Sequence, residues 1–264
     1  MDKKAVFNHY KYWLDRMLDN SLYFQIFFQE PYSLNANIST NTMDTEIFDD
    51  TIHLNFGISR GCLIDDDYPY VVKFDLHNAY HDGVYDMCNR EQCFYSMAAR
   101  ENLERYFVRP VYIGDYVKEI YTYTFEDVGG ICQEEYDEET AELELQEELD
   151  AKLAQGCPLQ KEDIQIVIPL FAYERADHFN PFDDSISEES EDIAESRTDS
   201  PLVNRNKLVG AAFIGEYGLD EFDRLSCFLS ENKINDLHCG NIGLVDSKYV
   251  IIDYAGFHDS DECC

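Results

Sequence analysis

Residues 234–257, INDLHCGNIGLVDSKYVIIDYAGF, constrain the fold most, because they combine a polar turn, a strand and a carboxylate at the end of that strand. Asp236 and Asn241 lie five residues apart in a turn that contains glycine. The apolar run of residues 249–252 predicts a β-strand that ends at Asp253. Phosphoryl transfer needs one carboxylate near the attacking hydroxyl, with an amide and a second carboxylate holding Mg²⁺. The segment therefore supplies side chains that suit a nucleoside triphosphate and its metal.

Two charged residues lie upstream on different predicted elements. The sequence YVVKF, residues 70–74, predicts a strand in which Lys73 lies on the face opposite its apolar neighbours. Glu91 begins residues 91–107, in which apolar side chains recur at roughly helical spacing. We therefore expect a strand lysine followed by a helix that starts at Glu91.

Residues 51–64 predict two short strands around a turn that carries glycines. Gly57 and Gly61 permit the backbone to approach a phosphate closely, and Ser59 and Arg60 add hydrogen-bond donors. An ordinary hairpin turn with a glycine at each end explains the same residues. Both interpretations remain open on the sequence alone.

A later segment, residues 164–179, predicts a strand buried on both faces that becomes polar at Tyr173 and Glu174. If this is the last strand of a small antiparallel sheet, the backbone of residues 171–175 becomes a hinge that can hydrogen-bond adenine. A core strand followed by the start of a helix explains the sequence equally well.

In their order along the chain, these motifs resemble the protein-kinase-like superfamily, especially its small-molecule and phage-encoded branches with the loop Asp-Leu-His-x-x-Asn. The resemblance implies that Asp236 is the catalytic acid and that Asn241 and Asp253 bind the metal. It also implies that Lys73 binds the α and β phosphates and pairs with Glu91. The chain departs from the family pattern in having one residue more than the usual Asp-Phe-Gly motif after the final strand.

The same resemblance assigns further residues to ATP and Mg²⁺, the two cofactors that it implies. Gly57, Ser59, Arg60 and Gly61 would form a short phosphate-binding turn, and Tyr173 would lie in the adenine-binding hinge. Glu101 and Glu104 are weaker alternatives to Glu91 as the partner of the strand lysine.

The fold class implied by the resemblance is α+β, a kinase-like two-lobe fold. It has a small five-stranded antiparallel lobe with one helix and a truncated, mainly helical second lobe. The expected organisation is an N-terminal helical segment (1–45), the sheet lobe (46–176) with an acidic insertion near 126–163, an acidic linker (177–205), and the helical lobe with the catalytic and metal-binding loops (206–264).

The formal net charge of −34 is concentrated in residues 126–163 and 183–199. Leucines among glutamates in the first block predict an amphipathic helix, and the second block, nearly free of large apolar groups, predicts a disordered linker. Such a surface repels phosphate backbones, so we expect no direct binding of nucleic acid. It suits a basic protein partner, or imitates nucleic acid toward a nucleic-acid-binding protein, or simply maintains solubility.

Residues 1–30 carry an aromatic and aliphatic stripe at helical spacing, which predicts a helix packed on the chain's own core, with partner binding as the alternative. No run is long and apolar enough to span a bilayer, and the N-terminus lacks a signal-peptide pattern. We therefore expect a cytoplasmic protein without membrane contact, and the phage-type loop suggests the cytoplasm of an infected bacterial host.

Two functions follow from these features. The first is Mg·ATP-dependent phosphoryl transfer to an unknown hydroxyl of a protein or small molecule, with nucleotidyl transfer as a variant that uses the same metal ligands. The second is a pseudokinase or acidic interaction protein that binds a basic or nucleic-acid-binding partner.

Overall fold

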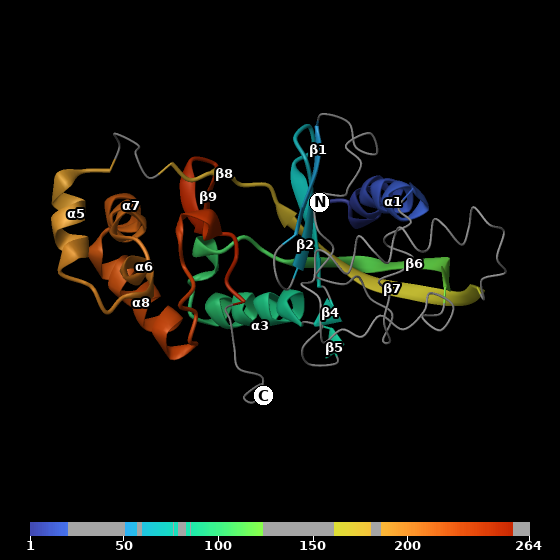
Figure 1. Cartoon of the computed structure of the whole chain (residues 1–264). Coiled ribbons are helices and arrows are strands. Elements are labelled where there is room, and N and C mark those ends of the chain that lie inside the picture. The colour runs from blue at the N-terminus through green and yellow to red at the C-terminus, as the bar shows by residue number, and fades with distance from the viewer. Residues whose placement is uncertain are drawn as a thin grey trace, which may run out of the picture.

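The computed structural model has an α+β fold with a small antiparallel sheet and several helices (Figure 1). It describes residues 1–20, 51–56, 60–75, 77–78, 83–84, 86–123, 161–180 and 186–255. Gly57, Ser59 and most of the acidic insertion near 126–163 lie outside the described residues, so the predictions made for them are not tested.

The main sheet has five antiparallel strands in the order β1-β2-β3-β7-β6. Its strands are β1 (Ile52–Phe56), β2 (Arg60–Asp65), β3 (Tyr70–Asp75), β6 (Val111–Tyr123) and β7 (Lys161–Glu174). The alternation of β-branched and aromatic residues in these segments favours the extended backbone. Strand β7 is the last of the five along the chain, but it lies inside the sheet between β3 and β6.

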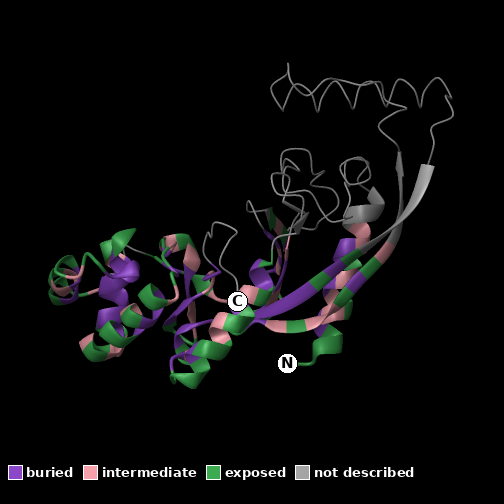
Figure 2. Ribbon diagram, turned by 90° about the horizontal axis from the view of Figure 1, so that it is seen from below, coloured by how far each residue is buried: buried purple, intermediate pink, exposed green. Residues whose placement is uncertain are grey.

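Helix α1 (Lys3–Asn20) covers one face of this sheet (Figure 1). Its side chains Val6, Tyr10 and Leu14 are buried against Val72 and Phe74 of β3 in one apolar cluster. The N-terminal stripe therefore packs on the chain's own core, as predicted, over the side chains that the structure describes up to Arg16. Figure 2 shows buried residues both along this sheet and among the later helices.

Helix α3 (Met87–Arg100) follows β3 and lies on the sheet face away from α1. The prediction of a helix over residues 91–107 was wrong at both ends, because α3 begins four residues before Glu91 and ends at Arg100. Asn102 adopts a positive φ of 59°, which a continuing helix does not allow, and Glu104–Tyr106 then forms a short 3₁₀ helix, η2. Glu91 therefore lies in the second turn and not at the helix start.

The early start of α3 has a tertiary cause. The carboxylate of Asp75, at the end of β3, accepts hydrogen bonds from the backbone N–H groups of Met87 (3.0 Å) and Cys88 (3.2 Å). These donors are among the four that a helix N-terminus leaves unpaired. A distant strand residue thus caps the helix, which local sequence patterns do not reveal.

Asp75 should make stability depend on pH. Burial raises its pKa from 3.8 to about 7, despite the lowering effect of the hydrogen bonds from Cys88 and Met87. Between about pH 4 and 7 the folded state therefore keeps a proton that the unfolded state has released, so the free energy of unfolding falls as pH rises. Urea denaturation across this range should show the stability of the wild type declining relative to Asp75→Asn. A difference that does not change with pH contradicts this assignment.

The later part of the chain is mainly helical and carries a small second sheet. Its helices are α5 (Glu188–Glu195), α6 (Pro201–Asn204), α7 (Lys207–Tyr217) and α8 (Leu219–Glu231). Its strands β8 (Asp177–His178), β9 (Ile242–Val245) and β10 (Lys248–Ile251) pair in the order β10-β9-β8, and β4 (His77–Asn78) pairs with β5 (Gly83–Val84) elsewhere. The helical part expected from residue 206 onward contains α7 and α8.

The prediction that residues 183–199 form a disordered linker was wrong for the part that the structure describes, because it contains α5. The Ser187 hydroxyl accepts a hydrogen bond from the N–H of Ser190 (3.2 Å), and acidic side chains in the first turn suit the helix dipole. Ser190 and Ala194 are buried against α7, and Ile193 packs partly buried on the same apolar cluster, so a few side chains on one face dock this acidic helix.

Gly243 lets β9 approach the segment that follows β7. A Cβ at this position would lie 2.6 Å from the Ala176 Cβ and 3.0 Å from the carbonyl oxygen of Asp177. Gly243→Ala should therefore lower the free energy of unfolding by about 1–3 kcal/mol, measured by urea denaturation. Gly215→Ala is the matched control, because its Cβ would meet only the Ser190 hydroxyl at 3.4 Å and alanine favours the helix. Equal losses in the two variants would contradict the explanation.

Among the described residues, no helix is both long and apolar enough to cross a membrane.

Candidate functional site

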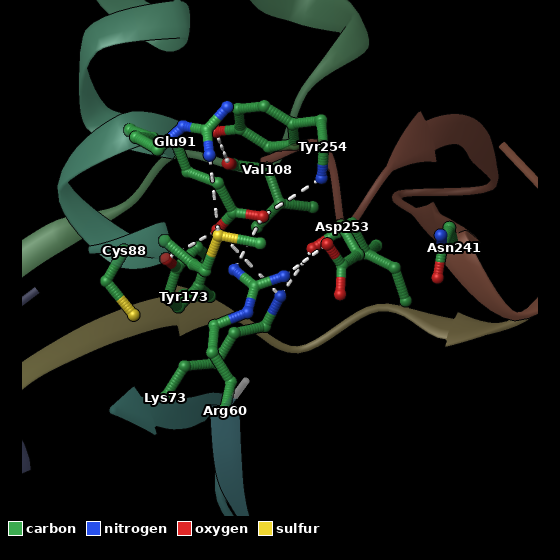
Figure 3. A network of polar contacts seen from close by, with 12 residues as sticks. Arg60, Lys73, Cys88, Glu91, Val108, Tyr173, Asn241, Asp253 and Tyr254 are labelled. Carbon is green, nitrogen blue, oxygen red and sulfur yellow. Dashed lines mark hydrogen bonds and ion pairs between the residues drawn. The ribbon is translucent and has the colours of Figure 1, made fainter. Parts of the chain in front are cut away.

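The side chain of Glu91 has no exposed surface and lies at the centre of a polar network (Figure 3). Its Oε1 accepts a hydrogen bond from the N–H of Tyr254 (3.0 Å) and lies 2.8 Å from Arg60 Nη1. Its Oε2 accepts a hydrogen bond from the Tyr173 hydroxyl (2.6 Å) and lies 4.0 Å from Lys73 Nζ. Residues from β2, β3, β7 and the segment after β10 therefore meet at one buried carboxylate.

Lys73 connects the sheet to the end of β10. Its side chain is on the face opposite the cluster packed under α1, as strand alternation predicted. Its Nζ donates a hydrogen bond to the carbonyl oxygen of Ile252 (2.6 Å) and lies 4.5 Å from the centroid of the Tyr173 ring. The ammonium group is therefore held beside the backbone that precedes Asp253.

Arg60 is the first residue of β2, and its side chain is buried between two carboxylates. One guanidinium nitrogen lies by Glu91, and the other donates a hydrogen bond to Asp253. The sequence interpretation placed Arg60 in a turn as a hydrogen-bond donor to phosphate. The structure places it instead in β2, where both carboxylates engage its guanidinium.

Gly61 faces the other side of the sheet. A Cβ at this position would lie 2.4 Å from the Phe74 ring, which is packed under α1. The absence of a side chain at Gly61 is thus explained by packing in the core. It does not need close approach of a phosphate, as the resemblance suggested.

Asp253 follows β10 and keeps 40% of its side-chain surface exposed. Burial raises the pKa of its carboxyl, but the positive charges of Lys73 and Arg60 and the hydrogen bond from Arg60 outweigh that effect and lower the pKa below its usual value. Asp253 is therefore an ionised carboxylate at neutral pH, with one side toward the cations and part of its surface open.

Asn241 lies beside the same strand end. Its carbonyl oxygen accepts a hydrogen bond from the N–H of Ile252 (2.9 Å), and its side-chain Nδ2 donates one to the carbonyl of Asp236 (2.5 Å). Figure 3 shows Asn241 on the side of Asp253 away from Arg60. The carboxamide is therefore oriented by the loop that carries Asp236.

The loop before β9 ends in a short 3₁₀ helix, η4 (Cys239–Asn241), and holds Asp236 with its side chain 20% exposed. Arg205 Nη2 lies 3.5 Å from Asp236 Oδ1. His238 Nδ1 accepts a hydrogen bond from the N–H of Gly240 (3.0 Å), so this histidine braces the turn.

A pocket of about 380 Å³ opens beside Lys73, between the sheet and the start of the second sheet. It is lined by Cys62, Ile64, Asp66, Val71, Lys73, Val108, Tyr173, Glu174, Arg175, Ala176, Asp177, His178 and Ile252. Seven of these thirteen residues are apolar or aromatic, if Cys62 is counted among them, and the other six are His178 and five charged residues. The pocket thus combines an apolar surface with polar groups that can orient a ligand.

The hinge predicted over residues 171–175 needs correction. Tyr173 is still within β7, where it pairs with Val71, so its backbone serves the ladder and its ring forms a wall of the pocket. The connection itself is Arg175 and Ala176, and the N–H of Arg175 donates to the carbonyl of Pro69 (3.0 Å). The alternative, a helix starting after the strand, was also wrong, because β8 follows.

The donor set beside the pocket fits one kind of metal. Asp253 and Asn241 offer a carboxylate and an amide oxygen, and Mg²⁺ is typically bound by one or two such groups together with substrate phosphates. Among the described residues, no cluster of three or more His, Cys, Asp or Glu side chains could hold a metal by itself. These residues therefore suit a metal that arrives with phosphates.

Comparison of the chain with protein-family models, with curated proteins and with solved structures finds no match in any of the three. The functional conclusion therefore depends on the geometry of this chain. That geometry brings together five of the residues singled out from the sequence, namely Arg60, Lys73, Glu91, Tyr173 and Asp253.

Proposed function

We propose that the chain binds Mg·ATP in a kinase-like two-lobe arrangement and transfers a phosphoryl group to a hydroxyl acceptor. The observation that carries this proposal is the convergence of Lys73, Glu91 and Asp253, from β3, α3 and the segment after β10. Lys73 and Ile252, the residue before Asp253, line the 380 Å³ pocket. Positioned charge is most of what phosphoryl transfer asks of a protein.

Each group has a role in this proposal. Adenine takes the apolar part of the pocket beside Tyr173 and Ala176, and Lys73 faces the phosphates. Asp253 and Asn241 hold Mg²⁺, which when bound neutralises charge on the phosphates. Asp236 accepts or orients the proton of the acceptor hydroxyl. The local positive charge of Lys73 matters here, because a net charge of −34 opposes the binding of an anionic nucleotide.

The second candidate is a pseudokinase or acidic interaction protein, and two contacts favour it. Arg60 pairs with Asp253, and Arg205 lies near Asp236, so both acids that the chemistry requires have cationic partners within the chain. In this case the acidic surface binds a basic protein or a nucleic-acid-binding protein.

Labelled nucleotides separate these functions. We expect the purified protein with Mg²⁺ to transfer label from γ-labelled ATP to itself or to a lysate acceptor, and Asp236→Asn to lose transfer while still binding Mg·ATP. Label from α-labelled ATP would indicate nucleotidyl transfer instead. An interaction protein would show neither transfer nor thermal stabilisation by Mg·ATP, and its partner would be released from a pull-down as salt rises.

A further inference from the structure

Arg60 makes a closer contact with Glu91 than the strand lysine does. Its Nη1 lies 2.8 Å from Glu91 Oε1, whereas Lys73 Nζ lies 4.0 Å from Glu91 Oε2. The other end of the guanidinium donates to Asp253, and the Arg60 side chain is only 8% exposed (Figure 3). A single cation thus bridges the buried carboxylate of Glu91 and the partly exposed carboxylate of Asp253.

We propose that Arg60 is a built-in counter-ion of Asp253, which a divalent metal ion must displace in order to bind this carboxylate. This inference rests on the proposed function, because it concerns the metal that would accompany the nucleotide. Arg60 is then a positioning residue that sets how tightly the chain holds a metal before the nucleotide arrives.

The burial of the three side chains gives the direction of this competition. Glu91, with no exposed surface, holds the guanidinium from the interior, so Arg60 cannot swing out without leaving a buried carboxylate with a weaker partner. Asp253 is 40% exposed, so a metal approaches its open side. The Arg60 guanidinium keeps its proton at neutral pH. It therefore repels a metal cation that approaches the open side of Asp253.

Lys73 is a second cation near Asp253, but its ammonium group makes different contacts from those of Arg60. Lys73 Nζ donates to the carbonyl of Ile252 and lies over the Tyr173 ring. It lowers the pKa of Asp253 through its charge, yet the hydrogen bond that reaches this carboxylate comes from Arg60. Arg60 is therefore the group that a metal has to replace.

The test measures Mn²⁺ binding, without nucleotide, from the loss of the free-ion electron paramagnetic resonance signal. The main variant is Arg60→Met with Glu91→Gln, which removes both charges of the buried pair, because removing one alone strands the other. We expect this double variant to bind Mn²⁺ about fivefold more tightly than the wild type, the effect of losing one partly exposed ion pair. Adding Asp253→Asn should remove the gain.

Glu91→Gln alone is the matched control, because it keeps Arg60 on Asp253 and should show no gain in Mn²⁺ affinity. Arg60→Lys is a second variant that keeps a buried charge near Glu91. Its shorter side chain and single ammonium cannot bridge both carboxylates, so we expect a gain of severalfold. If the double variant does not give the native near-ultraviolet circular dichroism spectrum, the Arg60→Lys result decides.

The outcomes separate this inference from the proposed function. Unchanged or weaker Mn²⁺ binding in the folded variants, with Mn·ATP binding intact in the wild type, overturns the competition alone. Failure of the wild type to bind Mn·ATP overturns the proposed function. A gain that depends on Asp253 supports the competition in either case.

Discussion

Replacing Glu91 by alanine is expected to lower the free energy of unfolding by about 3–5 kcal/mol, the usual cost of breaking a buried ion pair by removing one partner. The change leaves the buried cations Arg60 and Lys73 without their shared anion. It also leaves the Tyr254 N–H and the Tyr173 hydroxyl without the acceptor that they use in the interior. Urea denaturation followed by circular dichroism measures the loss.

Glu101→Ala is the control for this prediction. Glu101 is the C-cap residue of the same helix, and its side chain is exposed. Its replacement should change stability by no more than about 0.5 kcal/mol. If Glu91→Ala costs no more than Glu101→Ala, the carboxylate network does not hold α3 to the sheet and the site is not preorganised.

Asp253→Ala is expected to abolish the stabilisation of the fold by ATP in the presence of Mg²⁺. A ligand at 100 times its Kd stabilises the native state by about 2.7 kcal/mol. For a chain of this size that stabilisation raises Tm by about 5–10 °C. Without the Asp253 carboxylate, Asn241 is the only metal ligand of the predicted pair that remains, so the shift should nearly vanish. Scanning calorimetry with Mg²⁺ and ATP, each alone and together, measures it.

Asp220→Ala is the matched control, because it also removes one carboxylate, but from α8 and not from the network of Arg60, Glu91 and Asp253. Asp220 is exposed in the first turn of α8, and its variant should keep the full shift with Mg·ATP. A shift in Asp253→Ala as large as that of the wild type would show that the nucleotide does not bind through this carboxylate.

Much of the sheet could be predicted from the sequence, because period-two alternation and β-branched residues act over a few neighbouring positions. The strand of Lys73 and the strand before Asp253 were located in this way. The proximity of Lys73, Glu91 and Asp253 also agrees with the order of motifs along the chain. The kinase-like interpretation and the roles of these residues stay predictions.

Other features depend on contacts between distant segments and left no local pattern. The position of Arg60 between Glu91 and Asp253 requires the register of β2 together with the packing of α3, and a charged residue next to a glycine turn is more typical of a solvent loop. Helix α3 starts early because Asp75 caps it across the fold. Tyr254, which fixes Glu91 through its N–H and donates its hydroxyl to the Val108 carbonyl, had no signal beyond its place after Asp253.

Acidic composition also misled the prediction for α5. Charge-rich segments with few large apolar groups are typically disordered, because they bury too little surface to offset the loss of chain entropy. In α5 the buried positions are filled by Ser190 and Ala194, whose small size permits close packing on α7. Whether this acidic segment folds depends on how closely α5 packs against α7, and the composition of α5 alone does not show that fit.

Photolabelling with an azido-adenine analogue of ATP in the presence of Mg²⁺ shows where the base binds, because the labelled peptide can be identified. If adenine occupies the pocket, we expect saturable labelling, prevented by excess ATP, in residues 173–178 or at another residue of the pocket wall such as Val71. Labelling that ATP does not prevent, or that falls on residues outside this pocket, would contradict binding of the base there.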